Sequence, residues 1–138
     1  MIRHGEVDCE FHQVFGGRID MELSPLGHRQ AKHLAKFLSE RSFDRIYRSP
    51  MVRVKQTAAP LLKALNQTAV ELEDLCEVDF GVWTGYKWHE IKDKFGKNAI
   101  DWLEHLQNGA IPEAEPINAY KMRIKKCLDL ILRDRDRG

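Results

Sequence analysis

The chain has 138 residues, a length that suits one domain, because a chain of this size buries roughly two thirds of its unfolded surface. Hydrophobic residues make up 43% and charged residues 31% of the sequence, which excludes a disordered or collagen-like chain. The formal net charge of +1 provides no general attraction to nucleic acid or to an anionic membrane. Any anionic ligand therefore needs a local site.

The number and spacing of the cysteines indicate the cellular compartment of the protein. Cys9, Cys76 and Cys127 are an odd number of widely spaced thiols without a Cys-x-x-Cys pair. This pattern is typical of reduced thiols in the cytoplasm and does not favour a zinc site. The apolar runs are too short for a membrane span, and the charged residues 3–6 do not fit a secretory signal. We expect a cytoplasmic protein with neither a membrane partner nor a nucleic-acid partner.

The first predicted elements follow an irregular start. Only two apolar residues precede the polar cluster at 3–6, too few for a buried strand, so we expect the first strand to be incomplete. Ser24 followed by Pro25 predicts an N-cap and the first residue of a helix. Apolar residues at helical spacing extend this amphipathic helix to Ser39; they are Leu26, Ala31, Leu34, Ala35 and Leu38.

Strands and helices then alternate along the chain. Residues 43–47 and 69–72 favour short strands, and a helix is predicted between them, from Ser49-Pro50 to about Leu65. Residues 79–85 contain two glycines and indicate a loop. Further helices are predicted at 88–95, 100–106 and 119–133.

This alternation predicts the fold class and the place of a site. Strands that alternate with helices are typical of an α/β protein, here a three-layer α/β/α fold with a largely parallel central sheet. Ligands of such folds bind at the carboxyl ends of the strands. We therefore expect the polar groups of residues 3–6 and 48–53 to converge at one edge of the sheet.

The tetrapeptide Arg3-His4-Gly5-Glu6 is the first candidate for chemistry. An arginine cannot lose its charge, so it is a poor choice for a core and favours an anion. A phosphoryl group fits best, because arginine binds phosphate oxygens bidentately and histidine is a nitrogen nucleophile. Gly5 lets the backbone approach the ligand closely. The alternative is a surface ion pair between Arg3 and Glu6.

Two later residues extend this pattern. Arg53 lies in the first turns of a predicted helix and can reach back to the same edge, although a solvated helix arginine is the simpler interpretation. Glu77 precedes an aromatic, glycine-rich loop and could donate a proton if burial raised its pKa. His28 and His33 are five positions apart on a helix, which favours solvated side chains over metal ligands.

Together these segments resemble the histidine phosphatase superfamily, also called the phosphoglycerate mutase-like family. The resemblance covers most of the chain and rests on four blocks in order. The blocks are residues 3–6 (Arg-His-Gly-Glu), 17–31 (Gly-Arg, Leu-Ser-Pro-Leu-Gly, Gln-Ala), 49–58 (Ser-Pro, Arg53, Gln-Thr-Ala) and 75–85 (Leu75, Glu77, Phe80-Gly81, Trp83, Gly85).

The resemblance implies metal-independent phosphomonoester hydrolysis or phosphoryl transfer, with no metal and no cofactor. His4 would attack the phosphorus to form a phosphohistidine, with its other ring nitrogen held by a backbone carbonyl. Arg3 and Arg53 would hold the phosphoryl oxygens, and Glu77 would protonate the leaving alcohol.

The same resemblance places Gly17 and Arg18 in the substrate pocket. The implied ligand is a small phosphorylated metabolite, and a homodimer is one possible assembly.

The sequence also departs from the family pattern. The family's second histidine, in a later Ser-His-Gly segment, has no counterpart here, and Val7 and Glu10 replace habitual polar residues. We therefore expect residues 1–138 to form a single domain that is incomplete at both ends, lacking the C-terminal strand and the second histidine. The alternative function is a catalytically incomplete phospho-ligand-binding or regulatory domain. The absence of the long insertions typical of the mutases favours a small phosphatase.

Overall fold

One βαβ unit forms the sheet of the computed structural model, which describes residues 1–135. Strand β1 (Ile46–Arg48) pairs in parallel with β2 (Ala69–Glu71), with Ile46 opposite Ala69. Helix α2 (Val52–Leu65) connects the two strands, as a parallel pair requires a crossover. The alternation expected from the sequence is confirmed, although each strand is shorter than its predicted range.

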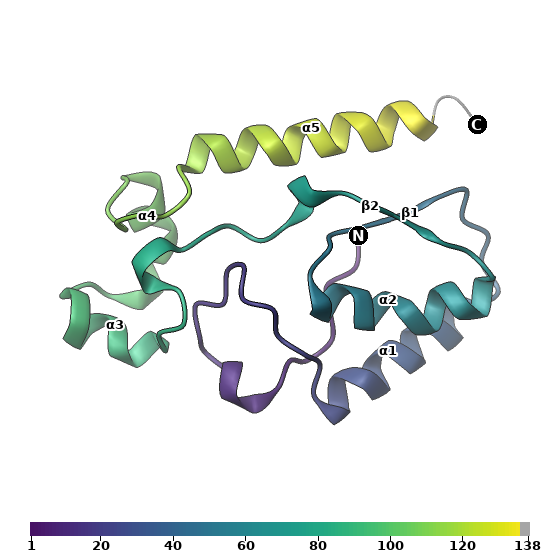
Figure 1. Cartoon of the computed structure of the whole chain (residues 1–138), viewed down its shortest axis with the longest axis horizontal. Coiled ribbons are helices and arrows are strands. Elements are labelled where there is room, and N and C mark those ends of the chain that lie inside the picture. Colours follow the sequence, from purple (N-terminus) through teal and green to yellow (C-terminus); the bar gives the residue numbers. More distant parts are fainter. Residues whose placement is uncertain (136–138) are drawn as a thin grey trace.

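The sheet lies between two helical layers. Figure 1 shows β1 and β2 between α5 (Ile117–Arg135) on one side and the pair of α1 (Pro25–Leu38) and α2 on the other. The expected large parallel sheet is not seen: among the described residues it has two strands. Met1 and Ile2 are exposed, and two apolar residues provide too little buried surface for a further strand.

Helix α1 begins where the sequence predicts. The Ser24 hydroxyl accepts a hydrogen bond from the Gly27 N–H at 3.0 Å, and Pro25 is the first helical residue. The buried face of the helix carries small residues, including Ala31 and Ala35, which lets α1 pack closely against α2. The N-cap and the apolar spacing thus determine both the start and the orientation of this helix.

Helix α2 begins two residues later than predicted. Met51, rather than Ser49, occupies the N-cap and provides no capping side chain. The carboxylate of Asp20 accepts the Val52 N–H at 3.2 Å instead, so a distant loop satisfies one of the unpaired donors at the helix start. The helix ends at Leu65, and the next residue, Asn66, adopts the left-handed conformation.

Residues of the second half of the chain form an aromatic core together with Phe15. Helices α3 (Trp88–Phe95) and α4 (Trp102–Gln107) confirm two predicted helices, except that Ala99–Asp101 forms a separate 3₁₀ turn before α4. The fully buried Trp83 lies in a cluster that includes Phe15 and Ile91. Three more 3₁₀ turns complete the described elements: Cys9–Phe11, Glu73–Leu75 and Gly81–Trp83. No helix in residues 1–135 is long and apolar enough to span a membrane.

Candidate active site

The segment that carries His4 is fixed by the loop before α1. The Glu6 N–H donates to the side chain of Gln30 at 2.8 Å, and the Glu6 carboxylate accepts the Ser24 hydroxyl at 2.5 Å. The Ser24 N–H also donates to the Glu6 carbonyl at 2.9 Å. The alternative of an Arg3–Glu6 ion pair is wrong for the described residues, because the side chain near the Glu6 carboxylate is that of His12, whose Nε2 lies 3.6 Å away.

Two glycines allow this segment to touch the start of α1. A Cβ atom on Gly5 would lie 2.8 Å from the Gly27 carbonyl oxygen, and one on Gly27 would overlap the Glu6 carbonyl. Real Cβ atoms essentially never approach backbone this closely. The close approach expected at Gly5 is therefore confirmed, and its contact partner is the α1 backbone.

Replacing Gly27 by alanine is expected to destabilise the protein by about 1–3 kcal/mol, the usual cost of overpacking. Intrinsic helix propensity alone predicts the opposite sign, a gain of about 1 kcal/mol. Urea unfolding measures the change. The control is His28→Ala, at the adjacent exposed position of α1, which we expect to stay near the wild-type value. A more stable Gly27→Ala protein would contradict the close contact.

The His4 ring is oriented by its own neighbour. Its Nδ1 lies 2.7 Å from the Gly5 carbonyl oxygen, and since a carbonyl only accepts, Nδ1 carries the proton. Nε2 is then the unprotonated nitrogen. Burial lowers the pKa of His4 below its ordinary value, and the Arg53 and Arg3 charges lower it further, against the Gly5 hydrogen bond and Glu77. A neutral imidazole is the nucleophilic form.

Arg53 is buried rather than solvated, so the simpler interpretation of a surface arginine is wrong. It is only 5% exposed, and its guanidinium donates to the carbonyls of Ile19 at 2.9 Å and Gly17 at 3.1 Å. Burial lowers its pKa, while Glu77 and Asp20 oppose this effect. No carboxylate of residues 1–135 lies within ion-pair distance of Arg53. A buried cation with only carbonyl partners favours an anionic ligand.

Thr57 connects His4 and Arg53, and its role was missed in the sequence. Its hydroxyl accepts the Gly5 N–H at 2.9 Å and donates to the Arg53 carbonyl at 2.7 Å. Thr57 lies one helical turn after Arg53 in the third sequence block, so the motif contained the signal. Neighbouring Gln56 accepts the Leu23 N–H at 2.7 Å. These side chains hold α2 against the loop segments of the site.

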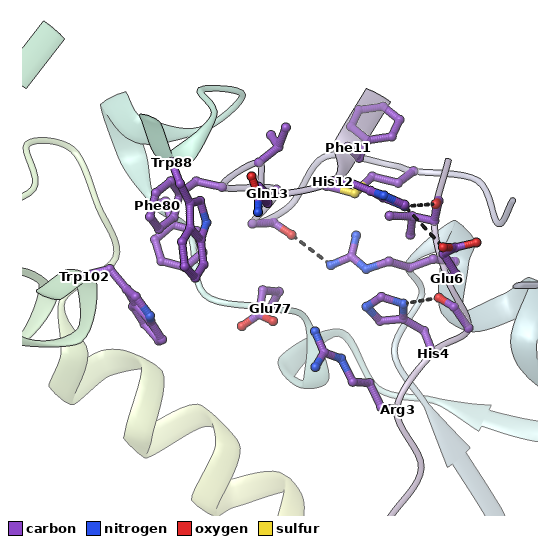
Figure 2. Close-up of a pocket in the computed structure, with 18 of the residues that line it drawn as sticks. Arg3, His4, Glu6, Phe11, His12, Gln13, Glu77, Phe80, Trp88 and Trp102 are labelled. Atoms are coloured by element: carbon purple, nitrogen blue, oxygen red, sulfur yellow. Dashed lines mark hydrogen bonds and ion pairs between the residues drawn. The ribbon is translucent and has the colours of Figure 1, made fainter. Parts of the chain in front are cut away.

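The predicted site residues meet in a cavity of about 730 Å³. Arg3, His4, Arg53, Glu77 and Gly17 all line it. Figure 2 shows the side chains of Arg3, His4 and Glu77 directed toward one another. The convergence expected of residues 3–6 and 48–53 is therefore observed for residues 3–6 and Arg53. Arg48 instead lies 3.3 Å from the carboxylate of Glu71.

Arg18 is the predicted pocket residue that the structure places elsewhere. It is absent from the cavity lining, and its guanidinium lies 3.8 Å from the carboxylate of Glu115. Gly17, by contrast, contributes both to the lining and to the binding of Arg53, and its φ of +48° is left-handed.

Glu77 is exposed at this cavity, so the burial on which its proton-donor role was conditional is not observed. One of its carboxylate oxygens accepts the Val78 N–H at 2.9 Å. Its backbone is held from α5, because Arg123 donates to the Glu77 carbonyl at 3.0 Å and to the Asp74 and Cys76 carbonyls at 2.7 Å. Sequence reasoning missed Arg123, since no local pattern pairs it with these carbonyls.

Glu115 binds Arg123 and makes the stability of the protein depend on pH. Its carboxylate accepts from Arg123 at 2.6 Å, and this hydrogen bond holds the pKa of Glu115 below its ordinary value of 4.5, although burial opposes it. Because the pKa of Glu115 is lower in the folded protein than in the unfolded chain, its ionised carboxylate stabilises the fold at pH values above the unfolded-state pKa. This stabilisation is lost as the pH falls through the folded-state pKa.

We expect Glu115→Gln to lower the free energy of unfolding at pH 7 by about 1–3 kcal/mol, the range for a charged hydrogen bond. The difference from wild type should shrink as the pH falls below about 4.5, because the wild-type carboxylate then becomes protonated. Urea unfolding at pH 7 and at a pH below about 4.5 measures the difference in the free energy of unfolding between wild type and variant. Glu113→Gln, at an exposed position, is the control. A difference that is independent of pH would contradict this assignment.

The structure shows no arrangement for a resident metal among the residues it describes. No group of three or more His, Cys, Asp or Glu side chains in residues 1–135 could hold an ion. His28 and His33 are both exposed on α1, as predicted.

The comparisons with known proteins agree with this site. Residues 1–138 match the family described as the histidine phosphatase superfamily (branch 1). Phosphoserine phosphatase 1 of Hydrogenobacter thermophilus is 30% identical over 129 residues, which are 94% of this chain and 61% of that protein. The uncharacterized phosphatase PhoE of Bacillus subtilis is 32% identical over 107 residues, 78% of this chain and 55% of that protein.

A solved structure shows the same fold. The alpha-ribazole phosphatase of Shigella flexneri superposes with a TM-score of 0.84 at 25% sequence identity, covering 98% of this chain and 67% of that one. The present chain thus spans about 60% of the length of its curated relatives. The fold of the described residues is phosphoglycerate mutase-like.

Proposed function

Because the chain belongs to the histidine phosphatase superfamily, branch 1, we propose that it hydrolyses phosphomonoesters without a metal, through a phosphohistidine on His4. A phosphatase is proposed rather than a mutase. The relatives described above are named as phosphatases, and the substrate proposed here is likewise a small phosphorylated metabolite.

The observation that carries this proposal is the state of His4. Its Nδ1–H is bound to the Gly5 carbonyl, which leaves the lone pair of Nε2 for attack. The pKa of His4 is lowered by burial and by two arginines, so the ring is neutral near pH 7. Arg53 lines the same cavity without a carboxylate partner among the described residues. A nucleophile and an anion-binding cation are therefore combined in one site.

The reaction follows in two steps. His4 Nε2 attacks the phosphorus, the bond from phosphorus to the leaving oxygen breaks, and Glu77 gives its proton to that oxygen. Water then attacks the phosphohistidine, Glu77 accepts a proton from the water, and inorganic phosphate leaves as neutral His4 is restored. Arg3 and Arg53 stabilise the charge on the equatorial phosphoryl oxygens in both steps.

A second candidate function is phospho-ligand binding without turnover. The exposure of Glu77 favours it, because the burial on which the proton-donor role of Glu77 was conditional is not observed. In this alternative, Arg3, His4 and Arg53 bind the phosphoryl group and the leaving alcohol is not released.

Phosphate release from p-nitrophenyl phosphate by the purified chain, with EDTA present, tests the proposal. We expect turnover that EDTA does not reduce. Loss of turnover on chelation would contradict the metal-free mechanism. Thermal stabilisation by inorganic phosphate without any turnover would assign the chain to the binding function.

The remaining features of the whole protein are proposals too. We propose that β1 and β2 belong to a larger, largely parallel sheet of a three-layer α/β/α fold, which the likeness to the longer Shigella flexneri structure supports. The three free cysteines support a cytoplasmic location. The homodimer stays a prediction.

A further inference from the structure

The cavity has an aromatic end opposite its charged end. Figure 2 shows Phe80, Trp88 and Trp102 gathered on one side, Arg3 and His4 on the other, and Glu77 between them. All of these residues line the same cavity. A phosphoryl group at His4 would therefore direct its ester substituent past Glu77 toward the aromatic side chains.

The side chains of the aromatic end pack against one another and against Phe15. The backbone N–H of Trp88 donates to the Gln13 carbonyl at 2.8 Å, and the Trp88 ring stacks on Phe15 at 5.9 Å with 23° between the planes. Phe80 and Trp102 meet edge to face at 5.5 Å. Trp88 nevertheless keeps 41% of its surface exposed. An indole that stacks on a neighbouring ring and stays partly exposed is suited to stacking a planar group.

The ionisable residues that line the cavity lie at its charged end. Arg3, His4, Arg53 and Glu77 serve the phosphoryl group in the proposed function, and Glu6 and His12 lie 3.6 Å from each other. Figure 2 places both Glu6 and His12 on the His4 side. Of residues 1–135, those that line the aromatic end therefore present no charged side chain to an ammonium or a carboxylate of a substrate.

We propose that the preferred substrate has an uncharged aromatic leaving group, which stacks on the exposed face of Trp88 beside Trp102. This inference rests on the proposed function, because it assumes that the phosphoryl group binds at His4 and Arg53. It predicts discrimination against phosphorylated amino acids, whose ammonium and carboxylate groups would lose water without gaining a partner. Trp88 is the specificity-determining residue.

Binding of phosphonates tests the inference without requiring turnover, because their P–C bond is not hydrolysed. Isothermal titration compares methylphosphonate, benzylphosphonate and 2-amino-3-phosphonopropionate, which mimics phosphoserine. Benzylphosphonate is expected to bind about tenfold more tightly than methylphosphonate, as stacking and apolar burial of one ring predict. The aminophosphonate should bind no more tightly than methylphosphonate.

Variants assign the preference to one ring. In Trp88→Ala the preference for benzylphosphonate should fall to about twofold or less, while methylphosphonate binding is retained and shows that the protein is folded. Trp88→Phe should keep part of the preference. The control is Phe37→Ala, which removes an aromatic ring that is 70% exposed on α1 and absent from the cavity lining.

The outcomes separate the inference from the function on which it rests. Equal binding of methyl- and benzylphosphonate by wild type, or a preference that survives in Trp88→Ala, overturns the aromatic subsite and leaves the phosphoryl site intact. Tighter binding of the aminophosphonate than of benzylphosphonate overturns it as well. Failure of all three phosphonates to bind overturns the proposed function itself.

Discussion

Replacement of His4 by alanine is expected to lower kcat for p-nitrophenyl phosphate by about a thousandfold or more, the scale seen when a covalent nucleophile is removed. The variant loses the only proposed acceptor of the phosphoryl group, while Arg3 and Arg53 keep their positions. Binding of inorganic phosphate should therefore persist. Steady-state kinetics and isothermal titration measure the two effects separately.

The control for this variant is His33→Ala, which removes an exposed histidine of α1. Its kcat should equal that of the wild type. Because His4 is only half-buried, we also expect little change in the thermal midpoint of His4→Ala. A His4→Ala protein that keeps more than about a tenth of the wild-type kcat would contradict nucleophilic catalysis.

Replacement of Arg53 by methionine is expected to lower kcat/KM by about a hundredfold to a thousandfold, the scale for removing one charged group from a preorganised site. Arg53 is buried and bound through two nitrogens to the Ile19 and Gly17 carbonyls. Methionine preserves the apolar stem of the side chain but provides no donor. Inorganic phosphate should stabilise the wild type against heat and should no longer stabilise this variant.

The Arg53→Lys variant distinguishes the role of the positive charge from that of the guanidinium geometry. A lysine carries the charge but not the planar fork that reaches both carbonyls while facing the cavity. We expect it to recover only a small part of the lost activity. Arg29→Met, at an exposed position of α1, is the control for loss of one positive charge. Full activity in Arg53→Lys would contradict the role of the guanidinium geometry.

Local signals in the sequence predicted the local parts of the structure. The Ser24-Pro25 cap and the spacing of Ala31 and Ala35 define α1, because capping and amphipathic burial act within a few residues. The predicted start of α2 was wrong because the carboxylate that accepts the Val52 N–H belongs to Asp20. No sequence pattern near position 52 indicates this distant partner.

The identity of the candidate site residues could be predicted from sequence motifs. Their burial and orientation could not, because these depend on tertiary contacts. Arg3, His4, Arg53 and Glu77 were predicted from ordered motifs, and all four line one cavity. The burial of Arg53, the exposure of Glu77 and the outward position of Arg18 depend on contacts between distant segments. The same holds for Arg123, which holds the Glu77 backbone from α5.

The most direct test of the central claim is to trap the covalent intermediate. The protein is mixed with excess p-nitrophenyl phosphate, quenched in alkali, in which a phosphorus–nitrogen bond survives, and analysed by peptide mass spectrometry. We expect one phosphoryl group on the His4 imidazole, which is absent from His4→Ala and is lost after acid treatment. A phosphoryl group on another residue, or rapid turnover without any phosphorylated peptide, would contradict a phosphohistidine mechanism at His4.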